Sequence, residues 1–284
     1  MNDQAGALRD YIRRKNLSHL LTVRKNADSD SGVVITLSSG KGGVGKTTLA
    51  LNLALASDRN GLVVDGDFML GNLATMINEG PRRTWEEILR SPEIWKKAVV
   101  RLDDTTAVLA PAPAEDERQF RAVLTTDRVV RLLRDWQAGY DFIIIDTASG
   151  LATQVIEWCL AAQKLMVMVT PEPAACTDAY ALIKSISLTG KAPEIGILVN
   201  QYLPSDEAET VFRQLNMMSE RFLERSLEFY GAIPRSDEIA RSIRLQKPAM
   251  LAEPSDGLSS VLQEVNTRLH EFDYVNHEPL SAMG

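Results

Sequence analysis

The segment that most limits which fold this chain can adopt is the run GKGGVGKT at positions 40–47. An apolar run of strand length, residues 33–37, precedes it, and a helical pattern over residues 48–56 follows it. Glycines let a backbone turn tightly and aim its N–H groups inward, and the N-terminus of the next helix attracts anions. A strand, a glycine loop and a helix in this order predict a binding site for the phosphates of a nucleotide.

Two residues of the loop have expected roles in phosphate chemistry. Lys46 would reach the β- and γ-phosphates, and the hydroxyl of Thr47 would ligate Mg²⁺. The expected nucleotide contacts in this segment are Gly40, Lys41, Gly42, Gly43, Val44, Gly45, Lys46, Thr47 and Thr48.

Short apolar runs alternate with longer helical patterns along most of the chain. The runs show little apolar-polar alternation, which is typical of parallel strands buried on both faces. The expected strands cover residues 33–37, 62–64, 107–109, 142–145, 165–169, 195–199 and a short run ending near Ile233. The expected helices include residues 46–56, 175–187, 208–228 and 257–272. The order predicts an α/β fold with a doubly wound, mostly parallel sheet flanked by helices.

The 284 residues divide into four expected parts. We expect a basic amphipathic helical extension over residues 1–25 and a polar linker over residues 26–32. The nucleotide-binding domain is expected over residues 33–272, followed by a tail over residues 273–284. The net charge of −7 disfavours non-specific binding to nucleic acid or anionic lipid. The two cysteines form no CxxC pair, which argues against a cysteine-built metal site.

Two acidic segments follow apolar runs and complete the expected site. Asp65 and Asp67 follow the second expected strand, and Asp146 follows the apolar residues 142–145. Ligands of open α/β sheets bind at the carboxyl ends of the strands, so these carboxylates are expected near the glycine loop. Asp146 would hold Mg²⁺ through water, and residues 147–150 would form a segment that responds to the nucleotide.

The loop KGGVGKT at positions 41–47 resembles the deviant Walker A loop of the MinD/ParA ATPases, and the resemblance covers residues 32–272. It implies a slow ATP hydrolase with ATP and Mg²⁺ as cofactors, which forms a homodimer on binding ATP. Lys41 would reach the partner's phosphates, and Asp67 would orient the attacking water. The implied catalytic residues are Lys41, Lys46 and Asp67, and the implied metal-site residues are Thr47, Asp65 and Asp146.

The same resemblance implies which residues contact the base. Asn200 follows an expected strand and would hydrogen-bond the adenine edge, since an amide offers both a donor and an acceptor. Pro234 would pack beside the base. The chain departs from the family pattern after Asp67, where it reads FMLGN, and after Thr147, where alanine replaces the usual proline.

The first residues of the chain indicate which group of the MinD/ParA ATPases it resembles. The segment DQAGALR at positions 3–9 matches the D-Q-A-x-x-L-R motif of the FlhG proteins (also called FleN or YlxH), MinD-like ATPases that control flagellar number and placement. The resemblance implies that this helix binds the GTPase FlhF and stimulates GTP hydrolysis. The implied contact residues are Asp3, Gln4, Ala5, Leu8 and Arg9. The alternative is a helix that docks on its own domain.

Further partners implied by this resemblance are a flagellar transcription activator and a C-ring component. The expected location is the cytoplasm, with peripheral contact at the inner face of the cell membrane. Membrane association is expected to be weak, because residues 273–284 contain a proline and no basic stripe.

Three other functions are compatible with this glycine loop. A ParA-type partitioning or positioning ATPase would bind DNA or another cargo, and the negative net charge disfavours the DNA-binding form. A metal-cluster carrier would need paired cysteines at a dimer interface. A regulatory protein would use ATP only as a conformational ligand.

Overall fold

The computed structural model describes residues 31–114, 120, 126–203, 207–252 and 254–275. The helix and FlhF contacts predicted within residues 1–25 lie outside the described residues, as do most of the predicted linker and the last nine residues of the tail. The division into four parts therefore stays a prediction.

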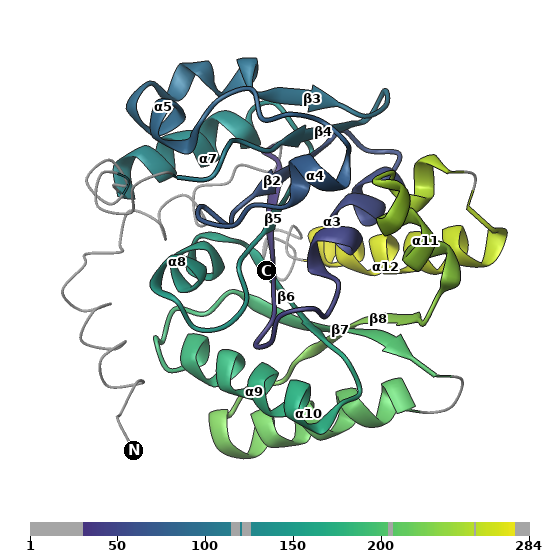
Figure 1. The fold of residues 1–284 in the computed structure, drawn as a ribbon. Helices are drawn as coiled ribbons and strands as arrows, with labels where there is room; N and C mark the ends of the chain where they lie inside the picture. The colour runs from purple at the N-terminus through teal and green to yellow at the C-terminus, as the bar shows by residue number, and fades with distance from the viewer. Residues whose placement is uncertain (1–30, 115–119, 121–125, 204–206, 253, 276–284) are drawn as a thin grey trace, which may run out of the picture.

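The described residues form an eight-stranded sheet at the centre of the molecule (Figure 1). Its strands are β1 (Val33–Ser38), β2 (Gly61–Asp65), β3 (Val99–Arg101), β4 (Thr106–Leu109), β5 (Phe142–Asp146), β6 (Lys164–Val169), β7 (Glu194–Tyr202) and β8 (Glu228–Pro234). They lie in the order β3-β4-β2-β5-β1-β6-β7-β8. Every neighbouring pair is parallel except β3 and β4, which confirms the predicted mostly parallel sheet.

Helices cover both faces of this sheet (Figure 1). The α-helices are α3 (Lys46–Leu55), α4 (Leu73–Met76), α5 (Trp85–Arg90), α7 (Thr126–Gln137), α8 (Thr153–Ala161), α9 (Pro173–Ser187), α10 (Glu207–Leu223), α11 (Asp237–Leu245) and α12 (Asp256–Val275). The described part of the chain also contains two short 3-10 helices, η1 (Pro92–Lys97) and η2 (Ala249–Leu251). One apolar cluster joins the sheet to α3 and α12, and a second joins it to α5, α7, α8, α9 and α10. The doubly wound arrangement is therefore confirmed.

Aromatic side chains dominate one part of the second cluster. All four tryptophans of the chain, Trp85, Trp95, Trp136 and Trp158, are at most 3% exposed. Phe68 lies among them, with its ring centroid 4.9 Å from that of Trp85 in an edge-to-face contact. The segment after β2 is thus packed directly into the core.

The structure differs from the sequence-based prediction at two elements. The helix expected over residues 208–228 ends at Leu223, because Glu224 adopts a left-handed backbone (φ 52°) and β8 begins at Glu228. The side chain of Asn216 accepts the N–H of Leu227 and holds the chain at this reversal. The antiparallel edge strand β3 was not predicted, since three residues carry too little pattern to identify a strand.

The sheet register brings three chain segments to one edge. β5 lies between β1 and β2, with Asp146 paired to Leu37 on one side and to Asp65 on the other. The strands run parallel, so the loops that leave the carboxyl ends of β1, β2 and β5 meet at the same place.

Close packing between β7 and β8 gives a test of this sheet. A Cβ atom on Gly196 would lie 2.3 Å from the ring of Tyr230, which is fully buried. We expect Gly196→Ala to lower the free energy of unfolding by about 1–3 kcal/mol, measured by denaturant unfolding, because the core there has no space for a methyl group. Gly80→Ala is the control, since no heavy atom lies within 4 Å of its Cβ. Equal stability of the two variants would contradict this packing.

Candidate functional site

The glycine loop connects β1 to α3, as predicted. Gly45 caps the N-terminus of α3 with a left-handed backbone (φ 96°) that other residues rarely adopt. Gly40 packs against α9 so closely that a Cβ atom would lie 2.2 Å from the backbone of Asp178. The loop is therefore held against the sheet and against α9, with the start of α3 directed toward a cavity.

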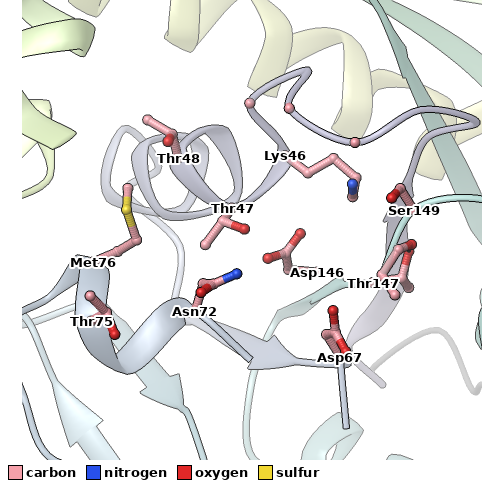
Figure 2. A pocket seen from close by; sticks show the side chains of 14 residues that line it. Lys46, Thr47, Thr48, Asp67, Asn72, Thr75, Met76, Asp146, Thr147 and Ser149 are labelled. Carbon is pink, nitrogen blue, oxygen red and sulfur yellow. The ribbon is translucent and has the colours of Figure 1, made fainter. Parts of the chain in front are cut away.

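This cavity has a volume of about 410 Å³ and is lined by three segments of the chain (Figure 2). The residues come from the glycine loop with α3, from the segment between β2 and the end of α4, and from the segment after β5. They are Gly42, Gly43, Gly45, Lys46, Thr47, Thr48, Asp67, Asn72, Thr75, Met76, Asp146, Thr147, Ala148 and Ser149. A small polar hollow with one lysine and two carboxylates suits the polyphosphate of a nucleotide and its cation.

Lys46 supplies the positive charge of the cavity. Its side chain is 9% exposed, and Nζ donates a hydrogen bond to Ser39 Oγ at 2.9 Å. Burial lowers the pKa of Lys46, and the charges of Asp146 and Asp67 act in the opposite direction. A lysine with so little water around it would gain strongly from a phosphate anion.

Asp146 supplies a carboxylate with one oxygen that lacks a hydrogen-bond partner. The residue is 4% exposed, and the buried Oδ1 atom has no hydrogen-bond partner. Burial raises the pKa of Asp146 to about 6, while a hydrogen bond from Thr47 and the charge of Lys46 lower it. An orphaned carboxylate oxygen beside the Thr47 hydroxyl is a suitable pair of oxygen ligands for Mg²⁺.

Asp67 approaches the cavity from the segment after β2 (Figure 2). Its Oδ1 accepts the N–H groups of Met69 at 3.2 Å and Leu70 at 3.0 Å, so the turn fixes the direction of the carboxylate. Asn72 follows in the same segment and lines the cavity as well.

The structure does not bring Asp65 into the cavity lining. The side chain is 2% exposed, and its two oxygens accept the N–H groups of Asp67 at 3.2 Å and Leu73 at 3.1 Å. Burial raises the pKa of Asp65 to about 7. The carboxyl group therefore anchors the segment that carries Asp67 and Asn72, rather than facing the space that they line.

Residues 147–150 are tied to β1 and to the glycine loop. Thr147 Oγ1 donates to the carbonyl of Leu37 at 3.1 Å, and the N–H of Gly150 donates to the carbonyl of Ser39 at 2.8 Å. Ser39 thus contacts both this segment and Lys46. Ser39 was not predicted from the sequence, because a serine between a strand and a glycine carries no distinctive pattern.

Lys41 lies outside the cavity lining. Its Nζ forms an ion pair with Glu172 Oε2 at 2.7 Å, and the two side chains are 44% and 63% exposed. The hydrogen bond to Glu172 raises the pKa of Lys41. Gly40 and Val44 are also absent from the cavity lining, so the loop presents six of its nine predicted contact residues to the cavity.

A second cavity of about 210 Å³ adjoins the first through Gly45 and Thr48, which line both. The predicted base contacts Asn200 and Pro234 lie in its wall. Asn200 Nδ2 donates to the carbonyl of Val44 at 2.8 Å, which joins β7 to the glycine loop. Gln201, Arg235, Ser236 and Asp237 from the same two loops also line this wall. The wall residues that were not predicted from the sequence are Leu49, Ile239, Ala240 and Ile243.

Two features are absent from the described residues. No helix among them is long and apolar enough to cross a membrane. They also contain no group of three or more histidine, cysteine or acidic residues arranged to hold a metal ion. Cys159 is buried within α8, and Cys176 is partly exposed on α9.

The fold and the loop together define a P-loop NTPase. A family model described as "ParA: NUBPL iron-transfer P-loop NTPase" matches residues 31–270. Because this match spans most of the chain, the protein belongs to the ParA family of P-loop NTPases.

Similar proteins agree with this assignment. The antiactivator FleN of Pseudomonas aeruginosa is 26% identical over 235 residues, which cover 82% of this chain and 84% of FleN. The flagellum site-determining protein YlxH of Helicobacter pylori is 25% identical over 276 residues, which cover 93% of this chain and 89% of YlxH. The predicted resemblance to the FlhG group of MinD/ParA proteins is therefore confirmed.

A solved structure supports the fold. MinD of Pyrococcus horikoshii, in complex with Mg-ADP, superposes with a TM-score of 0.70 at 21% identity, covering 87% of this chain and all of that one. The likeness confirms the P-loop fold.

The buried carboxylate gives a pH-dependent test. Burial raises the pKa of Asp146 to about 6, so the ligand-free folded state binds this proton more tightly than the unfolded state does. Its contribution to stability is present below about pH 4 and is lost as the pH rises through 6. We expect ligand-free Asp146→Asn to be more stable than the parent at pH 8, by on the order of 2 kcal/mol, with no difference near pH 4.

The measurement is denaturant unfolding of both proteins between pH 4 and pH 8. Asp104→Asn, at an exposed position, serves as the control and should follow the parent curve. Parallel curves for the parent and Asp146→Asn would contradict a pKa of Asp146 that burial has raised.

Proposed function

We propose that this protein is an ATP-hydrolysing switch that forms a dimer on binding ATP. The observation that carries the proposal is the cavity in which Lys46, Thr47, Asp67 and Asp146 meet (Figure 2). These residues combine a cation for the phosphates, oxygen ligands for a metal ion and a separate carboxylate for the attacking water.

The polyphosphate binds along the glycine loop. Backbone N–H groups of the loop and the N-terminus of α3 face its oxygens, and Lys46 leaves Ser39 to contact the β- and γ-phosphates. Thr47 would hold Mg²⁺ with its hydroxyl, and the unpartnered oxygen of Asp146 would hold it through water. When bound, Mg²⁺ offsets the negative charge that develops during phosphoryl transfer.

Hydrolysis depends on the placement of one water molecule. Asp67 accepts a hydrogen bond from this water and orients it toward the γ-phosphate. The carboxylate is suited to this role because Met69 and Leu70 fix one of its oxygens. The adenine occupies the second cavity, beside Asn200 and Pro234. This cavity adjoins the phosphate cavity at Gly45 and Thr48, which line both.

Lys41 acts across the dimer interface. It is exposed and lies outside the cavity of its own subunit, where it pairs with Glu172. Water weakens such an exposed pair, so Lys41 can exchange Glu172 for the phosphates of a second copy. A cation delivered to the transferring phosphoryl group stabilises its charge in the transition state.

Substitutions can separate the proposed role of Lys41 in dimerisation from the proposed role of Asp67 in hydrolysis. We expect Lys41→Ala to bind ATP and to remain monomeric, and Asp67→Ala to dimerise with ATP and to lose at least about 10²-fold in hydrolysis rate. Light scattering measures dimerisation, and phosphate release measures hydrolysis. Lys97→Ala, at an exposed position on η1, is the control. Dimerisation and turnover at the parent level in both variants would refute the mechanism.

The relatives and the N-terminal motif support a role in flagellar regulation. FleN is named an antiactivator, and YlxH is named a flagellum site-determining protein. We infer that this protein regulates flagellar number or placement and that its N-terminal segment, with Gln4 and Arg9, stimulates an FlhF-type GTPase. A flagellar transcription activator or a C-ring component is the further partner that the ATP-dependent dimer would recognise.

The N-terminal segment has its own test. A peptide of residues 1–25 is expected to raise the GTP turnover of a cognate FlhF, because Gln4 and Arg9 add a polar group and a cation to the neighbouring active site. The same peptide with Gln4→Ala should stimulate markedly less. Turnover that is unchanged by either peptide would leave only the family assignment and remove the FlhF role.

A metal-cluster carrier is the second candidate, because the matching family model is described by iron transfer. A cluster shared between two subunits needs thiolates at their interface. Cys159 is fully buried with its pKa raised to about 12 by that burial, and burial also raises the pKa of Cys176. We therefore favour the ATPase switch, and the iron content of the purified protein would separate the two.

A further inference from the structure

The residue before Asp67 is held on both sides by hydrogen bonds. The N–H of Gly66 donates to the carbonyl of Asp146 at 2.7 Å, and the carbonyl of Gly66 accepts the indole N–H of Trp158 at 3.2 Å. A Cβ atom on Gly66 would lie 2.8 Å from Ile145 and 3.2 Å from the indole nitrogen. The hydrogen bonds and the close packing at Gly66 therefore fix the position of the backbone that leads to Asp67.

The residue after Asp67 is held by the same tryptophan. Phe68 is 3% exposed, and its ring centroid lies 5.6 Å from that of Trp158 and 4.8 Å from that of Phe120. The carbonyl of Phe68 accepts the N–H of Ala114 at 2.8 Å. Asp67 thus stands between two residues that both contact Trp158.

Trp158 belongs to α8, which begins at Thr153, shortly after the cavity-lining residues 147–149. Its backbone carbonyl accepts the hydroxyl of Thr36 at 3.0 Å, so the residue is also tied to β1. The indole therefore connects the segment after β5 to the segment after β2, on the side of the sheet that carries α8 (Figure 1).

We propose that Trp158 is a positioning residue for hydrolysis: through Gly66 and Phe68, it holds Asp67 in place and couples it to residues 147–149. The proposal rests on the ATPase function proposed above. A nucleotide that displaces residues 147–149 would shift the start of α8, and the indole would transmit this shift to Asp67. The coupling needs no contact between Trp158 and the nucleotide.

Trp158→Phe tests the hydrogen bond, and Trp136→Phe is the matched control. Trp136 is fully buried and stacks on Trp158, with 6.5 Å between the ring centroids. Its indole nitrogen has no hydrogen-bond partner. Both substitutions remove one ring from the same core, and only the first removes a hydrogen bond to Gly66. The measurements are kcat and KM for ATP hydrolysis, the Kd for ADP and the melting temperature.

We expect Trp158→Phe to lower kcat about fivefold with unchanged KM and Kd, because an ordinary hydrogen bond is lost only from the placement of Asp67. Trp136→Phe should keep the parent kcat, and its melting temperature should fall no further than that of Trp158→Phe, because it loses no hydrogen bond. Equal kcat values in the two variants would overturn the proposal while leaving the ATPase function in place. A parent protein without ATPase activity would overturn both.

If Trp158→Phe does not fold, Phe68→Leu provides the test, since it keeps an apolar side chain and removes the ring contact with the indole together with those to Trp85 and Phe120. A reduced kcat with unchanged KM supports the proposal, and a parent kcat overturns it.

Discussion

The parallel pairing of β5 with both β1 and β2 is the constraint on which the rest of the site depends. This register places Asp146 beside the last residues of β1 and β2 and makes three loops converge on one cavity. Two of those strands end in a carboxyl group, and the third leads into the lysine-bearing loop. The cost of burying these charges is lowered because each lies within reach of an opposite charge or an N–H group.

Local chemistry made the glycine loop and Asp146 predictable from the sequence. A loop with Gly40, Gly45 and Lys46 after an apolar strand has few other purposes, and an acidic residue at the end of such a strand points to the same edge. The roles of Asp65 and Asp67 were harder to separate, because the sequence shows two carboxylates with a single glycine between them. Only the fold shows that Asp65 turns inward to accept two N–H groups.

Other parts depend on contacts that no local pattern contains. The end of α10 is set by the left-handed backbone of Glu224 and by the hydrogen bond between Asn216 and Leu227. The role of Trp158 depends on a partner 92 positions earlier in the chain. Helical patterning predicts that such a tryptophan is buried, but it carries no information on what the indole nitrogen meets.

The hydrogen bond from Asn200 to Val44 has a consequence for how this protein can change over evolution. The same amide stands in the wall of the second cavity and supports the backbone of the phosphate loop. A substitution that altered the preference for a base at this position would also release the loop from β7. With the base contact proposed for Asn200, selectivity for the base and support of the phosphate loop would be inherited together, and a lineage that acquired a new nucleotide would need a compensating support for the loop.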